Sequence, residues 1–225
     1  SGSGYQPKLE ELNKNNIDAT YNLIKAIKRY SKRPPTLVLM SSIHVYDKSR
    51  KVFSENDQLS PNSSYGMSKL TQEILINQAT QMGIIKSVIF RASNIYGPGC
   101  RPNYNSAIST FCHQAKNKEE IPLFANGKAT LDLIYIDDVI KALRNAKFFL
   151  RSGKNTFNLA SGRTVPINEI ISILCEISGQ EIRTKLIDTP FVQFEISKKL
   201  FDSVCPNFKL HNLHDGIRYT YESVN

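Results

Sequence analysis

Tyr65 and Lys69 lie four residues apart in the stretch SSYGMSK, and their types and spacing suggest acid/base chemistry. Residues i and i+4 share one face of a helix, so the phenol and the ammonium can reach a common point. A free phenol has a pKa of about 10 and is a poor base at neutral pH. A neighbouring ammonium favours the phenolate, which could then remove a proton from a sugar or alcohol hydroxyl. The same spacing also occurs on solvated helix faces, so the motif alone leaves both interpretations open.

Polar residues follow two predicted strands at the point where each strand ends. Ser41 and Ser42 come directly after the apolar run TLVLM, and Ser93 and Asn94 follow soon after a second run, IIKSVIF. Continuous apolar runs are typical of strands buried on both faces of a parallel sheet. Ligands of such sheets bind beyond the carboxyl ends of the strands. A serine hydroxyl there could orient the same substrate oxygen that Tyr65 deprotonates.

The remaining elements alternate in the order expected of an α/β protein. Residues 9–30 carry apolar side chains at helical spacing, a helix should follow SPNSS, and LIYI leads into a helix capped at Asp137. A further helix, INEIISILCEIS, follows TFNLA. This alternation predicts a parallel sheet with right-handed crossovers. The side chains expected to face inward are Leu9, Leu12, Ala19, Leu23, Ile27 and Tyr30 in the first helix and Met67, Leu70 and Ile74 in the second.

Asn16 is a polar residue on the apolar stripe of the first predicted helix. A polar side chain on a buried face costs free energy unless it finds a hydrogen-bond partner. Asn16 is therefore expected to be either a structural bridge or part of a site.

The chain has 225 residues, a formal net charge of +9, 40% hydrophobic residues and 22% charged residues. This composition is ordinary for a globular protein. The positive charge invites a nucleic-acid partner, but the basic residues are scattered, and no aromatic-interleaved basic patch or zinc-knuckle spacing accompanies them. We therefore predict no nucleic-acid partner. The same charge suits a phosphate-bearing small molecule.

The four cysteines and four histidines are scattered along the chain, which indicates neither a disulfide framework nor a metal site. Reduced cysteines are typical of the cytoplasm, and that is the predicted location. No apolar run approaches the ~20 residues of a membrane helix, and the polar opening SGSGYQPK lacks the apolar core of a secretory signal. We predict no membrane partner.

Taken together, six segments resemble a known family in its own order: NNIDATYNLIKAI, LVLMSSIHVYD, SENDQLSPNSSYGMSKL, FRASNIYGPGCRP, LIYIDDVIKAL and FNLASGRTVPINEI. They resemble the extended short-chain dehydrogenase/reductases, in particular the NAD-dependent epimerase/dehydratase family that acts on nucleoside-diphosphate sugars. The end of the chain, FEISKKLFDSVCPNFKLHNLHDGIRYT, resembles the family's C-terminal part. The resemblance therefore covers nearly the whole chain.

The resemblance implies an α/β fold with a Rossmann-like parallel sheet and a small C-terminal α/β substrate-binding domain. Residues 1–98 would be the remainder of the NAD-binding domain, including the Tyr/Lys helix. Residues 99–225 would be mainly the substrate-binding domain, with about 132–160 returning to the Rossmann sheet.

The resemblance also implies roles for individual residues. Tyr65 would be the catalytic acid/base, Lys69 would bind the nicotinamide ribose and lower the tyrosine pKa, and Ser42 would contact the reacting hydroxyl. The residues implied at the cofactor, NAD or NADP, are Asn16, Ser41, Tyr65, Lys69, Ala92 and Ser93. The residues implied at the substrate are Ser42, His44, Asn94 and Arg101, and no metal is implied.

His44 stands where some family members place an acid used in dehydration. It could be a second acid/base, a substrate contact or only a residue that lines the pocket. The absence of that acid counts against a dehydratase. Tyr46 and Tyr96 are expected to pack beneath the site.

Two departures from the family pattern stand out. No G-x-x-G-x-x-G follows a strand, and the opening SGSG is interpreted as loop. A sheet without the family's early strands would expose unpaired edges, so we expect part of a longer protein, a truncated product or a remodelled relative. Leu131 also stands where the family usually has an arginine that grips the substrate diphosphate, while Asp132 remains. Arg101 or Arg163 could take over that contact.

The residues and the resemblance together leave three functions open. The first is epimerisation of a nucleoside-diphosphate sugar through a transient keto intermediate, and the second is NAD(P)H-dependent reduction of a 4-keto sugar nucleotide. The third is a non-catalytic fragment or pseudoenzyme without the cofactor half. The resemblance also implies a homodimer in which the helices of residues 9–30 and of Tyr65 form a four-helix bundle.

Overall fold

The structure is a computed structural model that describes residues 8–47, 49, 51–104, 106–191 and 193–224. The opening residues 1–4, interpreted above as loop, lie outside this part. No helix in the described ranges is long and apolar enough to cross a membrane.

The central sheet contains three parallel strands in the order β1 (Thr36–Ser42), β3 (Lys86–Ala92) and β7 (Thr156–Leu159). Their last residues, Ser42, Ala92 and Leu159, are neighbours in the ladder, so the three carboxyl ends form one edge. The apolar runs predict strands that stop two residues earlier, but Ser41 and Ser42 still pair with β3 and belong to β1. The predicted α/β class with parallel strands is confirmed.

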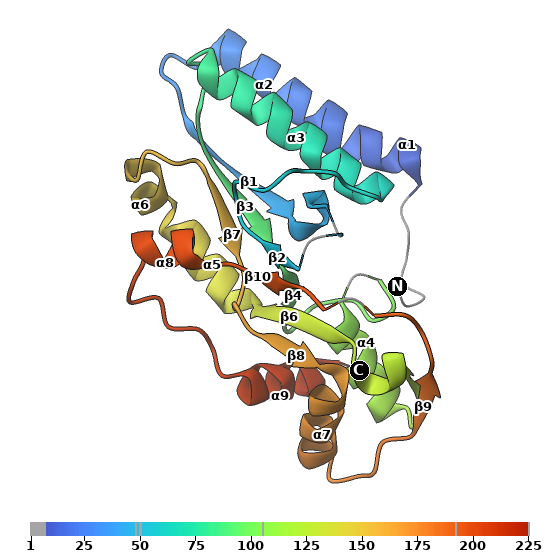
Figure 1. Ribbon diagram of the computed structural model, residues 1–225. Helices are drawn as coiled ribbons and strands as arrows, with labels where there is room; N and C mark the ends of the chain where they lie inside the picture. The colour runs from blue at the N-terminus through green and yellow to red at the C-terminus, as the bar shows by residue number, and fades with distance from the viewer. Residues whose placement is uncertain (1–7, 48, 50, 105, 192, 225) are drawn as a thin grey trace.

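Helices cover both faces of this sheet (Figure 1). On one face, α3 (Ser64–Gln81) runs beside a nearly continuous helix made of α1 (Leu9–Leu12), a π-helical segment (Asn13–Asp18) and α2 (Ala19–Tyr30). The opposite face packs against α5 (Ile136–Arg144), α6 (Ala146–Arg151) and α8 (Lys199–Val204). Neighbouring residues of β3 serve opposite faces because side chains alternate along a strand: Ile89 packs under α3, and Phe90 packs against Phe149 and Phe201.

Smaller sheets lie outside the central one. Strand β6 (Thr130–Tyr135) lies between β4 (Asn94–Tyr96), which is parallel to it, and β8 (Thr164–Pro166), which is antiparallel. Two parallel pairs complete the strands: β5 (Ile121–Phe124) with β9 (Thr184–Ile187), and β2 (Val52–Phe53) with β10 (Glu195–Ile196). A separate apolar core lies among β4, β5, β6 and β8 and the helices α4 (Ala107–Lys116), α7 (Ile167–Ser178) and α9 (Leu213–Ser223).

The predicted inward faces of the first two helices are largely wrong. Leu9, Leu23, Tyr30, Met67 and Ile74 are all exposed, and so is Ala19. Of the predicted set, Leu12 is buried and Ile27 and Leu70 are half-buried. The residues of α3 that are buried are Gly66, Ser68, Gln72, Glu73, Ile76 and Ala79. Polar groups occupy the inner face because they hydrogen-bond one another there, which a count of apolar spacing does not register.

One predicted helix boundary also differs from the structure. Helix α5 begins at Ile136 with Tyr135 as its N-cap, and Asp137 lies in the first turn instead of capping it. An acidic side chain in a first turn still complements the positive end of the helix dipole.

Candidate active site

Helix α3 begins immediately before Tyr65, and two contacts define that start. The Ser63 hydroxyl accepts a hydrogen bond from the backbone N–H of Gly66 at 3.1 Å and caps the helix. Gly66 lies so close to the 3-10 turn after β1 (Ile43–Val45) that a Cβ built there would be 2.3 Å from the carbonyl oxygen of His44. The first turn of α3 is thereby held against the end of β1.

Tyr65 lies within reach of the Ser42 side chain. Burial of the phenol raises the pKa of Tyr65, and the Ser42 side chain lowers it by less, so the net pKa is above the ordinary value. Tyr65 nevertheless keeps 38% of its surface exposed. The phenol is therefore protonated at neutral pH in this structure and has a hydroxyl partner at the end of β1.

Lys69 lies one turn after Tyr65 and is half-buried. Its Nζ donates a hydrogen bond of 3.0 Å to the carbonyl oxygen of Met40, and it lies 5.8 Å from the centre of the Tyr65 ring. Burial lowers the pKa of Lys69 below its ordinary value, because removing the ammonium from water disfavours the charged form. Burial and Ser42 account for the shift of the Tyr65 pKa, so the predicted lowering of that pKa by Lys69 stays a prediction.

His44 completes this group of side chains. Its backbone N–H donates to Ser42 Oγ at 3.3 Å, and its ring lies edge-on to the Tyr65 ring with centroids 5.9 Å apart. Ser42, His44, Tyr65 and Lys69 are therefore together at the carboxyl end of β1. Because the imidazole contacts the phenol ring, His44 lines the candidate site; whether it contacts substrate stays a prediction.

Asn16 bridges the π-helical segment to α3. Its side-chain amide donates to Ser68 Oγ at 2.9 Å, and its backbone carbonyl accepts from the side-chain amide of Gln72 at 3.2 Å. Gln72 also donates to Thr20 Oγ1 at 2.7 Å. Of the two roles expected for Asn16, the structure contains the bridge, and a role at the cofactor stays a prediction.

Ser41 points into a buried polar network. Its hydroxyl donates a 2.5 Å hydrogen bond to Glu73, whose carboxylate also accepts from Arg91 Nη2 at 2.7 Å and from Arg91 Nε at 3.1 Å. Arg91 Nη1 donates to Tyr46 Oη at 3.1 Å, and Tyr46 donates to Asn158 Oδ1 at 2.6 Å. Burial raises the pKa of Tyr46 to about 12, so its hydroxyl stays protonated and can donate. The hydroxyl of Ser41 is thus committed to the protein, and a cofactor role for this residue stays a prediction.

This network was not predicted from the sequence. Glu73 is eight residues after Tyr65 and four after Lys69, so the helical spacing that singled out the pair places it on the same face. The carboxylate of Glu73 at this spacing was the signal from which a polar contact on the inner face of the helix could have been predicted.

The residues after β3 gather around Asp132. Asn94 donates its side-chain amide to the backbone carbonyl of Asp132 at 2.9 Å. The Asp132 carboxylate, which is fully buried, accepts the backbone N–H groups of Ser161 at 2.8 Å and Gly162 at 2.9 Å. Burial raises the pKa of Asp132, and the two backbone donors offset part of that rise, so the net pKa stays above the ordinary value. Asp132 therefore ties β6 to the loop that follows β7.

Of the remaining predicted site residues, Ala92 pairs with Ser42 in the ladder of β1 and β3, whereas no contact described above joins Ser93 or Arg101 to the Tyr65 group. Ala92 and Ser93 are buried at the edge of the sheet, and the Ser93 N–H donates to the Leu159 carbonyl at 3.0 Å. Arg101 is exposed in the loop before α4. Arg163 binds Glu169 with Nη2 at 2.7 and 2.8 Å, and Leu131 packs against the apolar core beside Val165. Roles for these residues at cofactor or substrate stay predictions.

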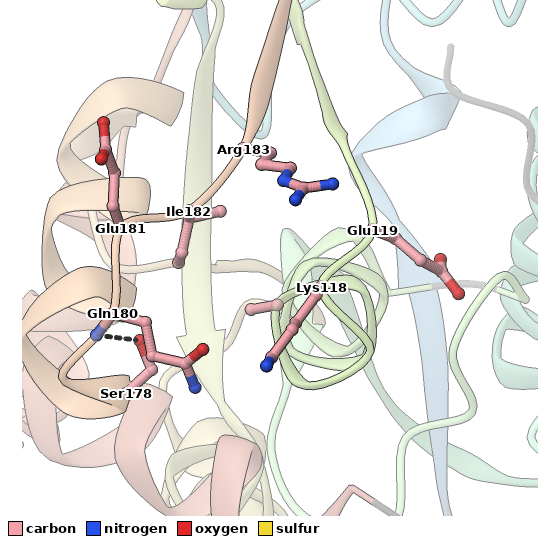
Figure 2. A pocket seen from close by; sticks show the side chains of 8 residues that line it. Lys118, Glu119, Ser178, Gln180, Glu181, Ile182 and Arg183 are labelled. Carbon is pink, nitrogen blue, oxygen red and sulfur yellow. Dashed lines mark hydrogen bonds between the residues drawn. The ribbon is translucent and has the colours of Figure 1, made fainter.

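The surface has a hollow beside the start of α3 and another one far from it in the fold. One of about 380 Å³ is bounded by the π-helical segment and the start of α3, including Asn13, Ile17, Ser64 and Met67. The other, of about 190 Å³, lies between the ends of α4 and α7 (Figure 2). Figure 2 shows Lys118 and Arg183 extending toward that space, while the carboxylates of Glu119 and Glu181 point away from it. Neither hollow is lined by a predicted site residue, although the first one lies beside Tyr65 in the sequence of α3.

A parallel sheet with a serine at the end of one strand and a Tyr/Lys pair on the covering helix defines a Rossmann-like, dehydrogenase-type protein. The NAD dependent epimerase/dehydratase family model matches residues 5–160. The chain belongs to this family, and the predicted resemblance is confirmed.

Individual relatives give the same result. The "Uncharacterized UDP-glucose epimerase YtcB" of Bacillus subtilis (strain 168) is 30% identical over 166 residues, which are 74% of this chain and 51% of that protein. The dTDP-4-dehydro-6-deoxyglucose reductase of Escherichia coli is 30% identical over 131 residues, 58% of this chain and 41% of that protein. This chain thus spans about half the length of the curated relatives it matches.

Solved structures also match. The UDP-glucuronic acid 4-epimerase of Bacillus cereus, in complex with UDP-glucuronic acid and NAD, superposes with a TM-score of 0.83 at 25% identity. The match covers 99% of this chain and 71% of that chain.

Proposed function

We propose that the complete enzyme epimerises a nucleoside-diphosphate sugar with NAD or NADP, through a transient keto intermediate. The observation that supports this most is the meeting of Ser42, Tyr65 and Lys69 at the carboxyl end of β1. These groups can hold a sugar hydroxyl and exchange its proton.

The residues present fit the nicotinamide-ribose end of the cofactor. Lys69 uses one N–H on the Met40 carbonyl, and an ammonium has three, so it can also donate to ribose hydroxyls. Asn16, Ser41, Ala92 and Ser93 are proposed as further contacts by family resemblance. When bound, the cofactor supplies the acceptor for a hydride from the sugar carbon and returns that hydride later.

Tyr65 performs the proton transfers in this proposal. Tyr65 is a neutral phenol in this structure, and the Lys69 ammonium together with a bound cationic cofactor ring would favour its phenolate. In that form Tyr65 takes the proton of the sugar hydroxyl as the C–H bond breaks, which leaves a carbonyl. Ser42 orients the same oxygen. The keto sugar then rotates so that its other face is presented. Tyr65 returns the proton to that oxygen, and the carbon regains hydrogen on this other face.

The proposed substrate contacts are His44, Asn94 and Arg101, with residues 99–225 forming most of the substrate-binding domain and about 132–160 belonging to the Rossmann sheet. Support comes from His44 beside Tyr65 and from strand β7, which pairs with β3. A nucleoside-diphosphate sugar is also the substrate named in the solved Bacillus cereus complex.

The test is turnover of UDP-glucose and UDP-glucuronic acid by the complete enzyme, with product identity followed by NMR. Tyr65→Phe should lower kcat by at least ~10²-fold, because it removes the acid/base. Tyr219→Phe, on the exposed face of α9, is the matched control and should retain full activity. Ser42→Ala should also move the rise of kcat/KM to higher pH, since Ser42 lowers the Tyr65 pKa. Near-normal turnover by Tyr65→Phe would contradict the assignment.

A second candidate function, reduction of a 4-keto sugar nucleotide, is favoured by the similarity to the Escherichia coli reductase. The two reactions use the same three residues, so the fate of the hydride decides between them. With deuterated NADPH, a reductase transfers label into the product and consumes the cofactor, whereas an epimerase recycles it. Absence of both turnover and calorimetric binding of NAD or NADP would favour the third hypothesis, a non-catalytic protein.

We also propose that the protein is a homodimer through the helix pair formed by α1–α2 and α3. Besides Tyr65, the large apolar side chains exposed there are Leu9, Tyr21, Leu23, Tyr30, Met67 and Ile74. An interface with a second copy would remove this surface from water.

A further inference from the structure

Three consecutive residues of β1 each contact a different residue of α3. The Ser42 side chain reaches Tyr65 and lowers its pKa, the Met40 carbonyl accepts a hydrogen bond from Lys69, and between them Ser41 donates to Glu73. The three partners on α3 are spaced by four residues, so they form one line along the helix. Strand and helix are therefore joined at three successive points.

The Glu73 contact differs from the other two in strength and burial. Glu73 is 2% exposed and Arg91 is 5% exposed, and the carboxylate accepts hydrogen bonds from Ser41 and from two nitrogens of Arg91. Charge-assisted hydrogen bonds of this fork geometry are stronger and more directional than neutral ones. Lys69, in contrast, makes a single hydrogen bond to β1, and both Lys69 and Tyr65 remain partly exposed.

The far side of Arg91 is anchored as well. Its Nη1 donates to Tyr46 and to the Glu55 carbonyl at 3.2 Å, and Tyr46 continues the network to Asn158 in β7. Glu73 thus connects α3 to all three strands of the central sheet.

We propose that Glu73 is a positioning residue: it sets the position of α3 along β1 and thereby holds Lys69 at Met40 and Tyr65 at Ser42. A helix rises 1.5 Å per residue, so sliding α3 by a single residue would stretch the Lys69–Met40 hydrogen bond out of range. The structural part of this proposal is independent of the reaction, and its consequence for catalysis rests on the proposed function.

The test measures the pKa of Lys69 by competitive acetylation and mass spectrometry in this chain, with neither cofactor nor substrate. Burial lowers that pKa in the native arrangement. In Glu73→Gln, loss of position would expose the ammonium, and the pKa should rise toward that of an exposed lysine. If Glu73→Gln only removed the carboxylate charge and left Lys69 in place, the pKa of Lys69 would fall further, because a nearby anion favours the ammonium. The two explanations therefore predict opposite signs.

Two further variants make the experiment decisive. Ser41→Ala removes one hydrogen bond of Glu73 without changing charge, and a smaller rise in the Lys69 pKa is expected. It decides the question if Glu73→Gln does not fold. Ile170→Ala weakens the separate core around α7 and should leave the Lys69 pKa unchanged, which controls for lost stability. An unchanged or lowered pKa in folded Glu73→Gln, or an unchanged one in Ser41→Ala when Glu73→Gln does not fold, would overturn the proposal.

Kinetics of the complete enzyme extend the test to catalysis. Glu73→Gln should lower kcat by up to ~10²-fold, the loss expected when reacting groups shift by about 1 Å. An inactive wild-type enzyme would contradict the proposed function, but the Lys69 measurement would still decide the positioning role.

Discussion

The Nζ of Lys69 donates a 3.0 Å hydrogen bond to the carbonyl oxygen of Met40, two residues before Ser42. This contact binds the candidate catalytic helix to the candidate catalytic strand. It also keeps the ammonium partly out of water, and the pKa of Lys69 falls as a result. Partial burial of the Lys69 ammonium therefore lowers the stability of the folded protein while it holds the ammonium beside Tyr65. The loss of stability can be measured.

Lys69→Met should stabilise the protein at pH 7 relative to wild type, and by less as the pH rises toward 10.5, the ordinary lysine pKa. Below the lowered pKa of folded Lys69, the side chain is protonated in both the folded and unfolded states, so folding carries the full desolvation cost. Above the lowered folded pKa, the folded protein releases the proton first, and wild type regains stability. Urea unfolding of both proteins from pH 7 to pH 10 checks this. A difference independent of pH would contradict it.

Gly66→Ala should destabilise the protein by about 1–3 kcal/mol, although alanine normally favours helices. The added Cβ would meet the His44 carbonyl oxygen at 2.3 Å, and a backbone atom cannot move aside cheaply. Gln78→Ala, at an exposed position of the same helix, is the control and should be near neutral. Chemical denaturation gives both values. Equal stability of the two variants would mean that the close approach is not limiting.

The Glu73–Arg91 pair should show strong coupling. Arg91→Met alone should cost about 3–5 kcal/mol, because it leaves the buried Glu73 carboxylate without its cation. The double variant Arg91→Met with Glu73→Met should cost less than the sum of the two single changes, since no charge then remains unpaired. A double-mutant cycle by denaturant unfolding measures the coupling, and simple additivity would argue against it.

The proposed homodimer predicts a change in mass with one substitution. Ile74→Asp places a charge on the exposed apolar surface of α3 and should convert a dimer into monomers in sedimentation velocity. Ile140→Asp, on the exposed surface of α5, is the matched control and should leave the mass unchanged. A monomeric wild-type protein, or a dimer unaffected by Ile74→Asp, would rule out this interface.

The α/β class and the central Tyr65–Lys69 pair could be predicted from the sequence because both depend on local order. Periods of two and about four residues decide which side chains can share a face, and apolar runs decide which strands lie inside. Residues 41 and 42 could likewise be expected at the edge of the sheet, since they follow a buried strand.

The inner face of the helix pair was decided only by tertiary structure. Leu23 and Ile74 are exposed, while Asn16, Gln72 and Glu73 face inward. Local spacing measures hydrophobicity, whereas burial of a polar group depends on a partner distant in the chain. Ser41 lies 32 residues from Glu73, and Tyr46 lies 112 residues from Asn158. Only folding brings these partners to hydrogen-bonding distance, and their bonds offset the desolvation that would otherwise keep such residues at the surface.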